Sequence, residues 1–236
     1  METKDYIIIS FSGCALTISI VSLIITLIQK NKETKRAIRK TISDTLEGIS
    51  KIGIETTKLR ATKDIDFNSE VNILLRRNYN SQRRILIAHA DYLIQRYDNL
   101  ATEIDCNILA GAYSTIGDQE KAELFWVKTI NKSISNPIRL MNLRGFGAFL
   151  FKNEQEELGR QYFNEGLLLD LPENDENRIL KVDTYLMLCD LEKEFGNKEY
   201  YETSLTNAME VLSTIKSNRR KEEMYELIRN KLPKVE

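Results

Sequence analysis

Residues 103–137 read EIDCNILAGAYSTIGDQEKAELFWVKTINKSISNP, and this stretch predicts two short helices joined by a tight turn at Gly117-Asp118. Apolar residues recur at spacings of three and four on both sides of the turn, which is typical of amphipathic helices that pack on each other. Small residues let two helices approach closely, and glycine accepts the backbone angles of the turn. The positions expected at the helix contact are Leu109, Ala110, Tyr113, Ala122 and Trp126.

Two further segments repeat this layout. Residues 137–169, PIRLMNLRGFGAFLFKNEQEELGRQYFNEGLLL, begin with a proline suited to the first helical turn and carry Gly147, Gly159 and Phe163 at the small and aromatic positions. Residues 178–216 keep a Gly196-Asn197 turn but place Tyr201 where a small residue is expected. The sequence therefore predicts three helix–turn–helix units within residues 101–217.

These units resemble the tetratricopeptide repeat, in which the first helix carries a large–small pair and an aromatic and the second a small residue followed by an aromatic. With the apolar N-terminus, LAGAYSTIGDQEKAELF and LRGFGAFLFKNEQEELGRQYF resemble bacterial membrane-anchored tetratricopeptide-like proteins over residues 81–220. The resemblance implies an all-α solenoid tied to the inner membrane and carries over no catalytic residue.

Residues 6–28, YIIISFSGCALTISIVSLIITLI, contain no charge and are long enough for a helix that crosses a bilayer. A cleaved signal peptide is the alternative, but its apolar region is usually about 7–15 residues and is followed by a small-residue cleavage site, which this sequence lacks. We therefore expect a single transmembrane helix preceded by a short tail at residues 1–5.

Charge around this segment predicts its orientation. Six cations crowd its C-terminal side, and the positive-inside rule then keeps the C-terminal domain in the cytoplasm. We thus expect a single-pass protein of the bacterial inner (cytoplasmic) membrane. Cys14, Cys106 and Cys189 show no paired spacing, which agrees with a reducing compartment. The six cations are Lys30, Lys32, Lys35, Arg36, Arg39 and Lys40.

The remaining boundaries follow from apolar periodicity. We expect a basic helical stalk at 29–61, a hinge at 62–68, an N-terminal capping helix at 69–100 and a C-terminal capping helix at 218–236. A seam of apolar residues and threonines along the stalk is typical of a short coiled coil, or of one amphipathic helix that packs on its own domain. The seam consists of Ile38, Ile42, Thr45, Ile49, Ile52, Thr56 and Leu59.

One face of the apolar segment is lined by small residues, which permit close helix approach in lipid. Self-association through this face would give a homo-oligomer; alternatively, the hydroxyls satisfy carbonyls of their own helix. The face consists of Ser12, Ala15, Ser19, Ser22 and Thr26.

Candidate enzymatic chemistry is sparse. The sole histidine, His89, lies in an apolar helical stretch and is expected to have a structural role. No spacing of Cys, His or carboxylates predicts a metal site, and no motif predicts a cofactor. A net charge of -1 argues against nucleic acid as the main partner. We therefore expect a non-enzymatic protein.

Repeat domains usually bind protein or peptide partners through the first helices of their repeats. In this register an asparagine can bind a peptide backbone, two cations can hold a carboxylate, and a phenylalanine can fill an apolar pocket. We expect a protein–protein interaction module, with three alternatives: a helper of secretion or envelope assembly with periplasmic repeats, a membrane-bound oligomerisation scaffold, or an enzyme acting around His89. The candidate partner-binding residues are Asn107, Ser114, Arg144, Phe151 and Lys152.

Overall fold

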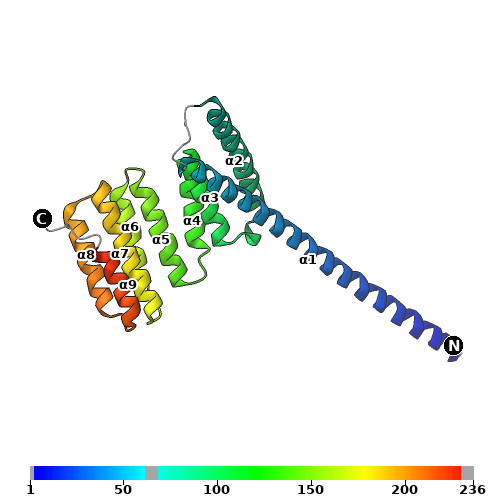
Figure 1. The fold of residues 1–236 in the computed structure, drawn as a ribbon. Helices are drawn as coiled ribbons and strands as arrows, with labels where there is room; N and C mark the ends of the chain where they lie inside the picture. The colour runs from blue at the N-terminus through cyan, green and yellow to red at the C-terminus, as the bar shows by residue number, and fades with distance from the viewer. Residues whose placement is uncertain (1–2, 62–68, 230–236) are drawn as a thin grey trace. The chain divides into compact units, whose positions relative to one another are not determined.

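The computed structural model describes residues 3–61 and 69–229, with side chains described for residues 22–59 and 69–229 (Figure 1). Within these ranges it contains nine α-helices, one short 3-10 helix and no β-strand, so the all-α prediction is confirmed. The chain divides into two compact units, Met1–Ala101 and Thr102–Glu236. Each unit is described by itself below.

The first unit consists of α1 (Thr3–Ala61), α2 (Glu70–Arg96) and the 3-10 helix η1 (Asp98–Leu100). Ser69 begins α2 as its N-cap, because its side-chain oxygen accepts a hydrogen bond from the backbone N–H of Asn72 at 3.4 Å. The hinge predicted at 62–68 lies outside the described residues. No helix in the part of the chain that the structure describes is both long enough and apolar enough to cross a bilayer.

The predicted stalk and N-terminal cap are not separate elements, because the C-terminal half of α1 packs against α2. Four residues of the seam are buried in this helical hairpin, whereas Ile38, Thr56 and Leu59 are half-buried. Arg83 Nη2 of α2 donates a hydrogen bond to Thr56 Oγ1 at 3.0 Å. The structure therefore favours an amphipathic helix that packs on its own unit over a coiled coil between chains. The buried residues of the hairpin include Ile42, Thr45, Leu46, Ile49 and Ile52 of α1 and Ile87, Ala90, Leu93 and Ile94 of α2.

The second unit is built from three consecutive helical hairpins and a final helix. Each hairpin contacts the next, and the last helix packs on the third hairpin. The hairpins therefore stack in chain order, as Figure 1 shows for the green to red helices. The helices are α3 (Glu103–Ile116), α4 (Gln119–Asn131), α5 (Asn136–Phe151), α6 (Glu156–Leu167), α7 (Asp175–Phe195), α8 (Lys198–Ser213) and α9 (Asn218–Arg229).

The turns lie where the sequence predicts them. Gly117 ends α3 with φ +81°, a left-handed conformation that favours glycine, and Asp118 then caps α4. Pro137 lies in the first turn of α5, where its missing N–H costs nothing. Asn197 caps α8 directly after Gly196.

A twelve-residue spacing marks where the two helices of each hairpin meet. The pairs are Ala110 with Ala122, Gly147 with Gly159, and Cys189 with Tyr201. In the second hairpin a Cβ on Gly147 would lie 2.9 Å from the carbonyl oxygen of Gly159, so the two helices touch backbone to backbone. In the third, the Cys189 thiol lies 3.7 Å from the backbone oxygen of Tyr201.

The final helix, α9, closes the stack. Its Met224 and Ile228 are buried in a cluster with residues of α7 and α8, whereas Leu227 is exposed. The carboxylate of Asp175 at the start of α7 accepts hydrogen bonds from the backbone N–H groups of Lys216 at 3.0 Å and Ser217 at 2.9 Å. This contact holds the chain at the point where α9 begins.

Candidate partner-binding site

The residues predicted to bind a partner lie on the first helices of two hairpins. Asn107 and Ser114 are on α3, where Asn107 is half-buried and Ser114 exposed. Arg144 and Phe151 are on α5, and Lys152 is its C-cap. Among the described residues no hydrogen bond or ion pair links the two on α3 to those on α5, so the structure gives no direct evidence that they act together.

Arg144 is the candidate with the most unusual environment. It is half-buried, and its Nη1 donates a long hydrogen bond of 3.5 Å to Thr184 Oγ1 of the neighbouring helix α7. Burial lowers the pKa of the Arg144 guanidinium, while the nearby carboxylate of Asp183 acts in the opposite direction. The guanidinium thus lies between two hairpins, where burial disfavours its charged form.

Asp183 of α7 belongs to the same site, although no sequence pattern selected it. Burial raises the pKa of its carboxyl group, and the charge of Arg144 partly opposes that shift. Asp183 is 39 positions beyond Arg144 in the sequence, and only the stacking of α7 on α5 brings their charges into interaction. The site therefore combines a cation and an acidic group whose charges interact.

Phe151 does not belong to this surface. Its side chain is fully buried and meets the ring of Phe163 edge-on, with centroids 6.2 Å apart. A Cβ on Gly159 would lie 2.6 Å from the Phe151 ring, because the ring fills the space that this glycine leaves open. The prediction that Phe151 contacts a partner is therefore corrected: it packs between hairpins.

Lys152 is exposed at the end of α5. It lies eight residues after Arg144, which corresponds to a rise of about 12 Å along a helix. The carboxylate clamp by both cations stays a prediction.

The small-residue face of the apolar segment is described only in part. The side chains of Ser12, Ala15 and Ser19 lie outside the described residues. Thr26 Oγ1 donates to the carbonyl oxygen of Ser22 at 2.9 Å, so this hydroxyl satisfies a carbonyl of its own helix.

His89 is exposed on α2. Ile87 and Ala90 on either side of it face α1 and are buried. No group of His, Cys, Asp or Glu in the described part of the chain is arranged to hold a metal ion.

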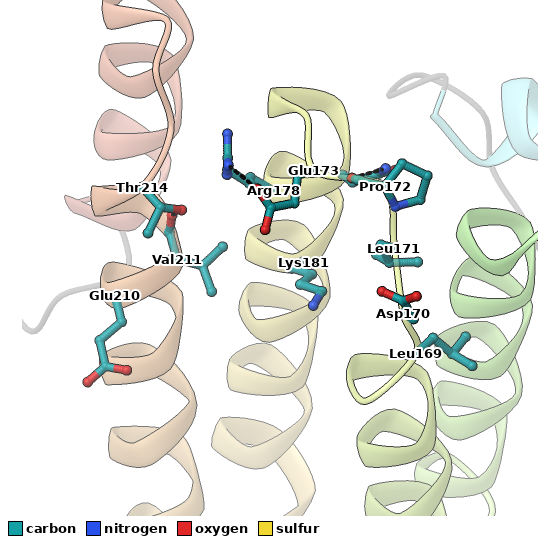
Figure 2. A pocket seen from close by; sticks show the side chains of 11 residues that line it. Leu169, Asp170, Leu171, Pro172, Glu173, Arg178, Lys181, Glu210, Val211 and Thr214 are labelled. Atoms are coloured by element: carbon teal, nitrogen blue, oxygen red, sulfur yellow. Dashed lines mark hydrogen bonds and ion pairs between the residues drawn. The ribbon is translucent and has the colours of Figure 1, made fainter.

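A pocket of about 530 Å³ lies between the α6–α7 loop, α7 and the end of α8 (Figure 2). Its wall combines apolar side chains with Lys181 of α7 and Glu210 of α8, and Arg178 forms an ion pair with Asp175 at 3.1 Å. The end of α8 lies about 30 residues beyond the other two segments in the sequence, which is why no local motif predicted the pocket. The lining residues are Leu169, Asp170, Leu171, Pro172, Glu173, Asn177, Arg178, Lys181, Glu210, Val211 and Thr214.

Comparison with models of protein families, with curated proteins and with solved structures found no match for this chain. The candidate site therefore has to be interpreted from its own geometry.

Proposed function

We propose that this chain is a non-enzymatic, membrane-anchored interaction module whose tetratricopeptide-like hairpins hold a protein or peptide partner. The observation that carries the proposal is Arg144, a half-buried guanidinium between α5 and α7 with one long hydrogen bond. A buried charge is costly unless it is paired, and a carboxylate from a partner would supply that pairing.

The acidic neighbour narrows the kind of partner. A peptide can offer a carboxylate or carbonyl oxygen to Arg144 and an amide or ammonium N–H to Asp183. Both groups of the protein have lost solvation, since burial shifts the pKa of each towards the neutral form. A ligand that hydrogen-bonds to both groups would therefore replace more of the lost hydrogen bonds to water than a ligand that contacts only one of them.

The membrane anchor is proposed from residues 6–28. In the last part of this segment, residues 23–28 of α1, nearly every position carries a large apolar side chain that is exposed. Because these positions are almost consecutive, their side chains lie on all sides of the helix. A helix that is apolar all round is typical of a membrane span. The exposed residues are Leu23, Ile24, Ile25, Leu27 and Ile28.

The partner proposal is tested by affinity purification of the tagged full chain from solubilised membranes, as wild type, Arg144→Glu and Lys193→Glu. Lys193 is an exposed lysine of α7 and serves as the matched control. Truncating one side of a buried charge pair costs about 2–5 kcal/mol, so Arg144→Glu is expected to reduce partner recovery at least about 30-fold. A partner recovered equally with all three proteins would contradict the proposal.

Orientation is tested separately with C-terminal fusions to reporters active only in the cytoplasm or only outside it. We expect the cytoplasmic reporter to be active. Activity of the external reporter would instead favour the periplasmic alternative.

A further inference from the structure

A strongly basic stretch of α1 follows the apolar segment directly. Between residues 30 and 40 the chain carries six lysines and arginines and one acidic residue, Glu33. At about 100° per residue, five of the six cations fall on one side of the helix. This basic face consists of Lys32, Lys35, Arg36, Arg39 and Lys40, of which all but the half-buried Arg39 are exposed.

The basic face adjoins the side of α1 that is buried within the first unit. Ile42 is fully buried in the same part of α1, on the side that contacts α2 and η1. At 100° per residue Lys35 lies about 20° round the helix from Ile42, whereas Arg36 and Lys40 lie about 120° and 160° from it. Four cations of the basic face line a shallow hollow of about 480 Å³ with Ser43 and Asp44. Asp44 is the acidic residue among the side chains that line the hollow.

Its distance from the apolar segment suits contact with lipid headgroups. Lys32 lies four residues after Ile28, which corresponds to a rise of about 6 Å along the helix, and Arg36 lies about 12 Å beyond Ile28. The headgroup layer is about 5–7 Å thick on each side of the hydrocarbon core, and lysine and arginine side chains extend towards it from a helix. Lys40, about 18 Å beyond Ile28, is still within about one Debye length of that layer at 0.1 M salt.

We propose that the basic face binds the phosphate-bearing headgroups of anionic phospholipids and so selects the lipids around the anchor. The inference rests on the proposed membrane anchoring. Lysines and arginines close to an anionic leaflet attract its acidic lipids, and each cation enriches acidic lipid around the helix by up to about five-fold. Nucleic acid is the weaker candidate, because the face is a single strip adjoining an apolar segment and the chain as a whole has a net charge of -1.

The test reconstitutes the full chain in phosphatidylcholine vesicles that contain a trace of spin-labelled phosphatidylglycerol or spin-labelled phosphatidylcholine. Electron paramagnetic resonance then measures how strongly each label is held at the protein surface. We expect phosphatidylglycerol to be preferred about three- to five-fold at 0.05 M salt, and the preference to vanish at 1 M salt, where the Debye length is about 3 Å.

Two variants of equal charge change give the control. Lys32→Gln with Lys35→Gln removes cations near the headgroup layer, and Lys51→Gln with Lys58→Gln removes cations about 35 and 45 Å beyond Ile28. The first variant should lose most of the preference, and the second should keep it. All four positions are exposed, so neither variant removes a packed side chain.

The outcomes separate this inference from the anchor itself. A chain that stays in neutral vesicles after carbonate washing, but shows no lipid preference, overturns the inference and leaves the anchor intact. A chain that leaves neutral vesicles contradicts the proposed anchor. Equal loss in both variants, or binding of single-stranded RNA that only the Lys32/Lys35 variant loses, would also overturn the inference.

Discussion

Arg160 of α6 and Glu192 of α7 form a two-point ion pair that joins the second hairpin to the third. Arg160 Nε lies 2.5 Å from Oε1 and Nη2 lies 2.9 Å from Oε2 of the glutamate, whose side chain is 0% exposed. The hydrogen bond to Glu192 raises the pKa of Arg160, and Glu192 also accepts the backbone N–H of Asn197 at the start of α8. The guanidinium lies over the ring of Tyr200, 4.4 Å from its centroid.

Arg160→Met is expected to destabilise the second unit by about 3–5 kcal/mol, because it leaves the buried Glu192 carboxylate without its cation. Urea unfolding of the full chain in detergent measures this change. Arg139→Met is the control, since the ion pair of Arg139 with Glu165 is partly exposed and worth about 1 kcal/mol or less. Similar losses in both variants would contradict the special role of Glu192.

Gly147→Ala is expected to cost about 1–3 kcal/mol, because the added Cβ would lie 2.7 Å from the Phe163 ring and 2.9 Å from the oxygen of Gly159. Gly111→Ala is the matched control on α3, where a Cβ meets nothing within 4 Å. There the gain in helix propensity should stabilise the chain by up to about 1 kcal/mol. Thermal unfolding measures whether each substitution lowers or raises the stability of the chain. A Gly147→Ala variant that is more stable than the wild type would show that the helices are not in backbone contact.

The α7–α9 connection is expected to weaken in acid. Hydrogen bonds from the backbone N–H groups of Lys216 and Ser217 hold the pKa of Asp175 below its ordinary value of 3.8. A carboxyl group with a lowered folded-state pKa stabilises the fold above its unfolded pKa, and this contribution is lost as the pH falls from about 4 through the folded value. The amide proton shifts of Lys216 and Ser217 should therefore titrate together below pH 3.8, and Asp175→Ala should abolish that titration. Amide shifts that move only above pH 4 would argue against the contact.

Ile49→Ala in the α1–α2 hairpin is expected to destabilise the first unit by about 2–5 kcal/mol, since Ile49 is buried against its own unit. If the seam packs within one chain, the unfolding midpoint of the first unit does not depend on protein concentration. The measurement is denaturation of wild type and variant at two concentrations 100-fold apart. A midpoint that rises with concentration would support pairing between chains instead.

Local pattern was sufficient for the helices and most turns. Gly117, Pro137 and Asn197 begin or end helices through their own local preferences. Such signals can be recognised from residues that are close together in the sequence. The site was predicted less well. Arg144 was selected because of its register, but the same reasoning also selected Phe151, since periodicity alone does not distinguish a helix face exposed to partners from one covered by the next hairpin.

The sequence by itself determined the helical class, the order of the hairpins and the short-range signals that begin and end each helix, because these depend on residues a few positions apart. Tertiary structure alone decided which faces are buried: the stalk seam packs on α2, Phe151 on Phe163, and Glu192 on Arg160. It also decided that Asp183 shares the environment of Arg144. The physical reason is that burial and charge pairing depend on contacts between residues 12 to 40 positions apart, which form only when the helices of a hairpin pack together and the hairpins stack.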